Sequence, residues 1–475
     1  MANTAANRQA PQARPDASRP RVGTGPVRRI RLPQKLRNVE LAMLVVACAI
    51  NATAIVLVQL AALKRIETQL VLLGVGLSVL AFGLHIAMRF VAREADPFLL
   101  PIATVLNGIG IAEIYRIDIA EGNAGWESAA VRQIAWTSIA IICAIATIVF
   151  LRNHRTLFRY VYLSGLVAIV MLLLPLAPLI GREVNGARVW IGLGSFANFQ
   201  PGELVKIALA VFFAGYLVRN RDSLSMVGKR VLGIRFPRLR DLGPLLVIWA
   251  LAMAVIVFQR DLGTALLFFG LFLSMLYVAT GRASWVLVGV TLIGVGAVVA
   301  SRLLPYVNSR FANWLDPFNP ERYDAATGGS YQVVQALFGL ANGSLIGTGL
   351  GKGSPDITPV AQSDYIIASL GEELGLAGIF AILSLYLIFV ARGFRIGVAG
   401  QDDFGKLLGI GLAFVVALQV FIVVGGVTRV LPLTGLTTPF LAAGGSSLVA
   451  NWVIVALLLR LSDTVRNAPR LVIEG

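Results

Sequence analysis

Long apolar stretches alternate with short polar ones along most of the chain. The stretches 39–63, 69–88 and 134–151 are each about as long as a bilayer-spanning helix, which needs ~20 residues. The same pattern recurs as far as residue 461 and predicts about twelve membrane-spanning helices. We place them at 39–63, 68–90, 97–115, 131–151, 157–180, 200–218, 243–258, 262–280, 284–303, 365–391, 406–427 and 439–461.

Composition supports this interpretation. Hydrophobic residues make up 57% of the chain and charged residues 14%, and the mean hydropathy is +0.78. Soluble domains carry about 25% charged residues and fewer apolar ones. The composition therefore excludes a soluble globular fold, and we predict an all-α polytopic membrane protein.

The net charge is +16, from 41 Lys and Arg against 25 Asp and Glu. In a soluble protein such an excess would suggest nucleic-acid binding. Here position argues for a membrane-topology signal instead, because nine basic residues gather before the first span. They are Arg8, Arg14, Arg19, Arg21, Arg28, Arg29, Arg31, Lys35 and Arg37. We interpret 1–38 as a disordered basic cytoplasmic tail and expect no nucleic-acid partner.

The other basic segments agree with this topology. With the N-terminus inside, the basic loops after residues 151 and 391, the stretch 219–240 and a C-terminal tail at 462–475 all fall in the cytoplasm. Lys64 and Arg65 lie on the other side, which is a small exception. We therefore predict a multi-pass protein of the plasma membrane with both termini cytoplasmic. The segment 304–364 then faces the outside, and long loops of this kind are usually functional.

Cysteine and histidine carry no recognisable site. Cys48 and Cys143 fall inside apolar spans, while His85 and His154 are isolated from each other. Neither a disulfide framework nor a zinc pair is predicted, and the sequence shows no dedicated metal cage.

Ionisable residues at the edges of spans are the candidates for chemistry, because they persist mainly where function or pairing offsets their cost. Glu203 and Lys206 share one helix face at i and i+3, which fits a buried structural ion pair as well as a role in anion handling. Asp261 lies in a short turn, where it can cap the following helix. These alternatives stay open at this point.

Asp364 stands where the long loop enters the next span. It could serve as an N-cap or as an interfacial anchor. Glu372 lies about 80° around the helix from it and about 12 Å deeper, so both side chains can line one cavity, whereas Glu373 is nearly opposite.

An ordered set of motifs then runs from about residue 97 to residue 461. The motifs are NGARVW (185–190), QPGELVK (200–206), QRDLGT (259–264), WLDP (314–317), QVVQ (332–335), GTGLG (347–351), SDY (363–365), GEELG (371–375) and PFLAAGGSS (439–447). In this order they resemble the SEDS family of peptidoglycan glycosyltransferases. The resemblance implies a SEDS-like helical bundle with a ten-helix core at 97–461 and a two-helix N-terminal extension at 39–96. Arg260, Val360, Val423 and Ala443 depart from the residues usual in the family, which at 260 is Pro.

The resemblance also implies an activity. SEDS proteins polymerise lipid II, a disaccharide-peptide on undecaprenyl pyrophosphate, with inversion at the outer membrane surface. Asp364 would be the catalytic general base, its pKa raised by burial and weakly by the charge of Glu372. The substrate-binding candidates are Arg188, Glu203, Lys206, Asp261, Arg310, Gln335 and Glu372, with Arg188 and Lys206 as the preferred pair for the leaving pyrophosphate.

Further expectations come with the family. A divalent cation, Mg²⁺ or Mn²⁺, would help at the phosphates, and no organic cofactor is expected. The implied partner is a class B penicillin-binding protein transpeptidase. The short C-terminal tail favours a role in cell elongation and shape over a septal one. The alternatives are a lipid II flippase, a small-anion transporter or a non-catalytic scaffold.

Overall fold

Ten membrane-spanning candidates form the framework of the protein. The computed structural model describes residues 35–467, with the exception of 185, 194–196, 226–229, 232–233, 236–242 and 326–327. Within that part of the chain, ten helices are long and apolar enough to cross a membrane. They are α1 (Lys35–Ala62), α2 (Thr68–Val91), α3 (Leu99–Glu121), α4 (Ala129–Phe150), α7 (Pro201–Ser225), α9 (Leu262–Thr280), α10 (Ala283–Leu303), α14 (Ile366–Val398), α15 (Asp403–Val427) and α16 (Gly445–Arg466). The protein is therefore a multi-pass helical membrane protein, as predicted.

The two remaining predicted spans coincide with shorter apolar helices. The first is α6 (Val161–Leu173), preceded by α5 (Arg155–Arg159) and extended by a 3₁₀ turn, η2 (Leu174–Leu176). The second is α8 (Gly243–Gln259). Pro175 and Pro178 end the α6 stretch early, because proline supplies no backbone N–H to continue a helix. The predicted span 157–180 is thus too long at its C-terminal end.

A small sheet follows α6, which an all-α prediction missed. Strands β1 (Gly181–Val184), β2 (Ala187–Leu193) and β3 (Ala197–Phe199) form an antiparallel sheet in the order β1-β2-β3, with Ile191 opposite both Gly181 and Phe199. A short hairpin, β4 (Arg230–Val231) with β5 (Ile234–Arg235), lies between α7 and α8. The strands are only two to seven residues long, so their alternating pattern is too brief to stand out beside the spans.

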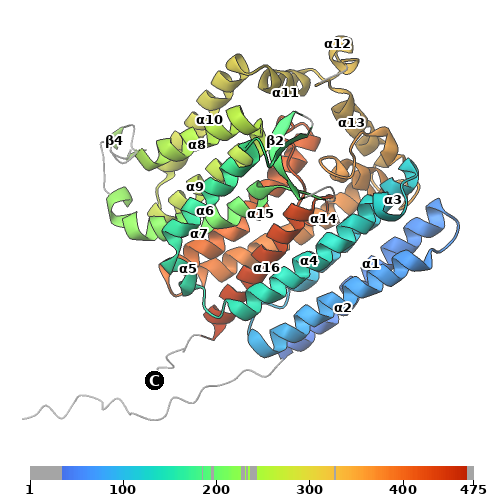
Figure 1. Ribbon diagram of the computed structural model, residues 1–475, viewed down its shortest axis with the longest axis horizontal. Coiled ribbons are helices and arrows are strands. Elements are labelled where there is room, and N and C mark those ends of the chain that lie inside the picture. The colour runs from blue at the N-terminus through green and yellow to red at the C-terminus, as the bar shows by residue number, and fades with distance from the viewer. Residues whose placement is uncertain are drawn as a thin grey trace, which may run out of the picture. The chain divides into compact units, whose positions relative to one another are not determined.

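About half of the predicted long loop is helical. It contains α11 (Pro305–Leu315), α12 (Pro320–Tyr323), α13 (Tyr331–Gly343) and a 3₁₀ turn, η4 (Pro355–Ile357). Figure 1 shows α11, α12 and α13 at the same end of the bundle as β2. We call this end the sheet end. A further 3₁₀ turn, η1 (Gly125–Glu127), precedes α4.

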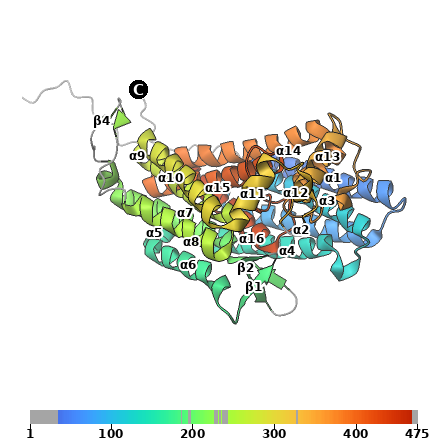
Figure 2. The same ribbon diagram turned by 90° about the horizontal axis from the view of Figure 1, so that it is seen from above.

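Helix α14 is broken at Gly375, whose φ of 68° belongs to the left-handed region that favours glycine. The loop after α13 bonds to the interrupted backbone: Leu376 N donates to Ser344 O at 3.0 Å, and Thr348 N donates to Glu372 O at 3.0 Å. Backbone groups freed by a break in an apolar environment need such partners. This loop and α14 therefore form one unit, and Figure 2 shows α13 beside α14.

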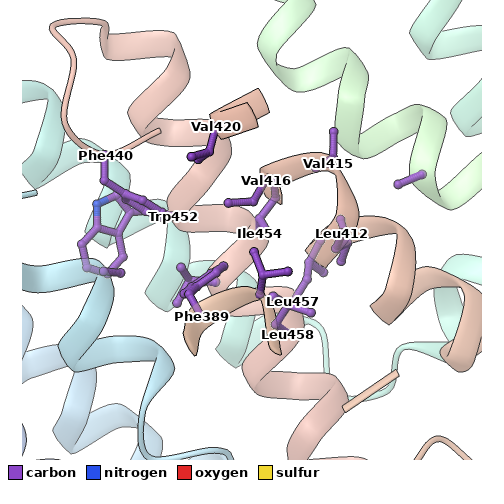
Figure 3. Packing of buried hydrophobic residues seen from close by; sticks show 14 of the residues in the cluster. Phe389, Leu412, Val415, Val416, Val420, Phe440, Trp452, Ile454, Leu457 and Leu458 are labelled. Carbon is purple, nitrogen blue, oxygen red and sulfur yellow. The ribbon is translucent and has the colours of Figure 1, made fainter. Parts of the chain in front are cut away.

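The main apolar core extends through most of the long helices, and one part of it lies between α14, α15 and α16. Phe440 packs edge-on against Phe389 and Trp452, with ring centroids 6.0 and 6.1 Å apart, and Val416 of α15 lies in the same cluster (Figure 3). Phe440 belongs to the loop before α16. The predicted start of the last span at residue 439 is therefore wrong, because Gly444 and Gly445 delay the helix until residue 445.

The extension predicted at 39–96 corresponds to α1 and α2. Helix α1 packs along α3, and α2 packs along α4 (Figure 1). Near the start of α1, the buried Glu40 carboxylate binds Arg37 and His85, each at 2.6 Å. Helix α1 begins at Lys35 and α16 ends at Arg466, so helix extends into both predicted tails, 1–38 and 462–475, whose other residues, 1–34 and 468–475, lie outside the described residues.

Candidate active site

Asp364 lies in the turn that leads into α14, at the sheet end. The turn is held locally by Ser363, whose N and Oγ both donate to Val360 O at 3.2 Å. It is also tied to the loop before α16, because Ala443 N donates to Gln362 O at 2.8 Å. The Asp364 side chain is partly buried. Two segments far apart in the sequence therefore fix its position.

Arg310 of α11 lies beside Asp364 without a direct ion pair. A Cβ built on Gly435 would be 3.7 Å from Asp364 Oδ2 and 3.7 Å from both terminal nitrogens of Arg310, so both charges lie beside Gly435. Arg310 Nη1 donates to Leu433 O at 2.7 Å. That bond anchors the guanidinium to the 428–444 loop and leaves its other N–H groups near the carboxylate.

Asp261 completes the charged group. Its Oδ1 accepts from Thr264 N at 2.9 Å and its Oδ2 from Thr264 Oγ1 at 2.6 Å, so it caps α9 as the capping interpretation proposed. The Asp261 carboxylate also interacts electrostatically with Asp364 and Arg310. The structure thus brings together three predicted site residues: Asp261, Arg310 and Asp364.

Burial dominates the electrostatics of this group. It raises the pKa of Asp364 to about 6, while the Arg310 charge and the Ser363 hydroxyl act to lower that pKa and the Asp261 charge raises it. Burial likewise raises the pKa of Asp261. The direction predicted for Asp364 agrees with this environment. The acidic neighbour that contributes is Asp261, whereas we expected Glu372.

A cavity of about 300 Å³ opens beside this group. Among the described residues that line it are three arginines and no carboxylate: Arg260, Arg310 and Arg429. Its wall also contains Tyr365, whose buried hydroxyl has no hydrogen-bond partner in the described part of the chain. The positive charges of the three arginines and the unpaired hydroxyl of Tyr365 therefore make this cavity suited to binding an anion.

The three arginines differ in how far they are already engaged. Arg429 donates from Nη2 to Trp314 O at 2.9 Å and also contacts Leu315 O, while Trp314 Nε1 donates back to Arg429 O at 2.9 Å. These hydrogen bonds in both directions connect the end of α11 to the loop after α15. Arg260 is exposed, and within the part of the chain that the structure describes it makes a single long hydrogen bond, 3.4 Å, to Gly186 O. Arg260 and Arg310 are thus the arginines placed for a ligand.

Lys206 lies in a buried ion pair with Glu203. Its ammonium group, 1% exposed, donates to Glu203 Oε2 at 2.7 Å, Gln419 Oε1 at 2.9 Å and Asn451 Oδ1 at 3.1 Å. Three acceptors use all three N–H groups of a lysine. The prediction that Lys206 contacts a leaving pyrophosphate is therefore not supported, and the structural ion pair with Glu203 is the better interpretation.

Arg188 does not join Lys206 either. It lies on β2, exposed, and its Nε donates to Glu183 Oε2 at 2.8 Å. The predicted pair for pyrophosphate is thus separated into a surface ion pair on the sheet and a buried one between α7, α15 and α16.

Glu372 and Gln335 hold the long segment before Asp364. Glu372 Oε1 accepts from Asn342 Nδ2 at 2.9 Å and from Ser354 N at 3.2 Å. Gln335 Nε2 donates to Tyr323 Oη at 2.9 Å, which ties α12 to α13. Both predicted substrate-binding residues therefore make structural contacts within 304–364 and with α14.

The buried ion pair between Arg116 and Glu373 is one that the sequence analysis missed. Arg116 Nε donates to Glu373 Oε1 at 3.1 Å, and Glu373 Oε2 accepts from Gly351 N at 2.7 Å. The signal was available, since an arginine within an apolar span is costly unless paired. No group of three or more His, Cys, Asp or Glu side chains able to hold a metal ion occurs among the described residues.

The sequence of this chain is similar to those of known peptidoglycan glycosyltransferases. A peptidoglycan glycosyltransferase RodA of Mycobacterium tuberculosis is 44% identical over 438 residues, which cover 91% of this chain and 92% of that protein. Residues before 96 must take part in this match, because 96–475 amounts to only 380 of 475 residues. The mycobacterial protein therefore shares at least part of the α1–α2 extension.

Solved structures show the same fold. One chain, solved under the description "Structural coordination of polymerization and crosslinking by a peptidoglycan synthase complex", matches with a TM-score of 0.60 at 24% identity and covers 78% of this chain and 99% of that one. Thermus thermophilus rod shape determining protein RodA matches with a TM-score of 0.52 at 22% identity, covering 78% and 96%. The family model FTSW_RODA_SPOVE, described as "Cell cycle protein", matches residues 96–467, well over half of the sequence. The chain is a member of the FtsW/RodA/SpoVE family.

Proposed function

We propose that this protein is a peptidoglycan glycosyltransferase that polymerises lipid II into glycan strands during cell elongation. The relatives at 44% identity are named peptidoglycan glycosyltransferase RodA. The observation that carries the catalytic part of the proposal is Asp364, a carboxylate with a raised pKa whose neighbour Arg310 lines a cavity together with Arg260 and Arg429. A base and an anion site side by side are what glycosyl transfer from a diphosphate donor requires.

In this mechanism Asp364 accepts the proton of the acceptor sugar's 4-hydroxyl. The hydroxyl oxygen forms a bond to the anomeric carbon of the donor while the bond from that carbon to the diphosphate oxygen breaks, with inversion. The electron pair of the broken bond leaves with undecaprenyl pyrophosphate. An aspartate with a pKa near 6 is a better base at neutral pH than one of ordinary acidity, yet it stays largely ionised.

Arg310 and Arg260 are assigned to the leaving diphosphate. Arginine suits this task because its planar guanidinium can bind two phosphate oxygens at once. Arg260 has φ of 58°, which proline cannot adopt, so the family's usual Pro could not keep this turn unchanged. The exposed Arg260 therefore gives this chain an additional cation over the cavity. A divalent cation, Mg²⁺ or Mn²⁺, would supply further charge through the phosphate oxygens and water.

We also assign twelve spans, with α6 and α8 crossing the membrane beside the ten longer helices. The sheet end then faces outward and both termini face the cytoplasm. The basic loop residues Arg152 and Arg155, after α4, support this orientation by the positive-inside rule. A class B penicillin-binding protein is the proposed partner, supported by the synthase complex whose chain shares this fold.

Purified protein in liposomes tests the proposal. We expect labelled lipid II to be converted to polymer, and Asp364→Asn to lose activity by ~100-fold or more, the usual range for a general base. Asp364→Glu keeps a carboxylate and is the matched control for partial activity. Full polymerisation by Asp364→Asn would reject the catalytic assignment. Movement of lipid II across the bilayer without polymer would favour the transport alternative.

A further inference from the structure

The α1–α2 extension touches the segment that precedes the catalytic turn. Gly351, in that segment, has φ of 82° and lies so close to α1 that an added Cβ would be 2.6 Å from Ala61 Cβ and 3.2 Å from Val58 O. No real Cβ tolerates 2.6 Å, so only glycine fits here. The backbone of the segment 344–358 therefore rests directly on the end of α1.

The same glycine is bound on its other side by α14. Gly351 N donates to Glu373 Oε2 at 2.7 Å, and Gly353 N donates to Glu373 Oε1 at 3.2 Å. Arg116 of α3 completes the contact, since its Nη2 donates to Gly353 O at 2.5 Å. Residues 351–353 are thus held between α1, α3 and α14.

A second contact fixes the end of α1 against α3. Tyr115 Oη donates to Glu67 Oε2 at 2.9 Å, in the turn between α1 and α2. The same turn is closed by Gln59, whose side chain bonds the backbone N and O of Glu67. Tyr115 and Arg116 are neighbours, so adjacent residues of α3 hold the α1–α2 turn and the 344–358 segment.

We propose that the α1–α2 extension is a positioning element for the catalytic turn. By fixing Gly351, it limits where the segment 344–358 can lie and therefore where Asp364, thirteen residues later, is held. The segment 359–365 follows directly and has its own bonds, among them Gln332 Nε2 to Pro359 O at 3.3 Å and Ala443 N to Gln362 O at 2.8 Å, so the contact with α1 acts together with these bonds. This inference rests on Asp364 as the proposed base.

A double-mutant cycle on the purified full-length protein tests the contact. Gly351→Ala introduces a Cβ that meets Ala61, and we expect kcat for lipid II polymerisation to fall by about tenfold, within the usual coupling range of touching residues. Adding Ala61→Gly removes the atom it meets and should restore much of the loss. Gly349→Ala is the matched control: φ there is 100°, but its nearest neighbour is Lys352 Cδ at 3.6 Å, not α1. Ala61→Gly should not rescue it.

A second pair of variants tests position rather than strain. Ala61→Leu presses α1 against Gly351, and we expect kcat to fall while KM for lipid II and the melting temperature stay close to the parent values. Ala49→Leu, on an exposed part of α1, should leave all three unchanged. Equal effects of the two variants, or no rescue of Gly351→Ala, would overturn the inference. If Asp364→Asn stays active while the rescue is seen, the proposed base is wrong but the contact stands.

Discussion

At the residue scale, the ionisation of Asp364 should determine where kcat falls on the acid side of the pH–rate profile, which we call the acid limb. The base must be deprotonated, so kcat should fall as pH drops through about 6, the raised pKa of Asp364. Arg310→Gln removes a cation that favours the ionised form, which should move the acid limb to higher pH. Asp261→Asn removes an anion and should move it to lower pH. Rates measured between pH 4.5 and 8.5 check both signs.

Two outcomes would contradict this assignment of the acid limb. One is an acid limb near the ordinary pKa of an aspartate, and the other is a shift of both variants in the same direction. Stability offers an independent check. Because the folded pKa lies above the unfolded one, ionisation of Asp364 destabilises the fold progressively from about pH 4, the unfolded pKa of an aspartate, to about pH 6, and fully above that. Asp364→Asn should therefore raise the melting temperature most at pH 8, about half as much at pH 5, and little at pH 3.5.

At the element scale, the buried pair of Lys206 and Glu203 should matter for stability more than for substrate binding. Lys206→Met leaves Glu203 and two amide oxygens without their donor, and breaking one side of a buried pair costs about 3–5 kcal/mol. We expect a clear loss of melting temperature in detergent. Arg188→Ala, in the exposed pair with Glu183, is the control and should change the melting temperature little. A stable Lys206→Met protein with weak lipid II binding would restore the original prediction.

The elements also show how far sequence patterns reach. Apolar stretches of about twenty residues predicted the ten long helices well, because that length is a requirement of the bilayer. The spacing of Glu203 and Lys206 correctly placed both on one helix face, yet it could not show that α15 and α16 supply Gln419 and Asn451. Helical geometry allowed Glu372 to share a cavity with Asp364, but its carboxylate instead accepts hydrogen bonds from Asn342 of α13 and Ser354 of the 344–358 segment. Contacts between distant segments carry no local signal.

At the scale of the whole molecule, the assignment of twelve spans can be tested at three loops around α4 and α6. Ala124 precedes α4, Asn153 follows it, and Glu183 lies on β1 after α6. If both helices cross, Ala124 and Glu183 lie outside and Asn153 lies in the cytoplasm. In intact cells, a membrane-impermeant maleimide should label Ala124→Cys and Glu183→Cys, while Asn153→Cys should react only after permeabilisation. Native Cys48 and Cys143 sit within α1 and α4, away from the aqueous loops.

The position of Glu183 decides the role of the short helix α6. Helix α6 and its 3₁₀ extension cover residues 161–176, about 24 Å at 1.5 Å per residue, which is less than the ~30 Å of a typical hydrocarbon core. A short helix can still cross where the bilayer thins or where neighbouring helices surround it, and α6 packs along α7. Labelling of Glu183→Cys only after permeabilisation would mean that α6 turns back. The sheet and Arg188 would then lie on the cytoplasmic side. The cavity next to Asp364 would lie there too, because Arg260 and Gly186, which line it, bond to each other beside that sheet. Such a cavity could not receive a lipid-linked donor from the outer leaflet.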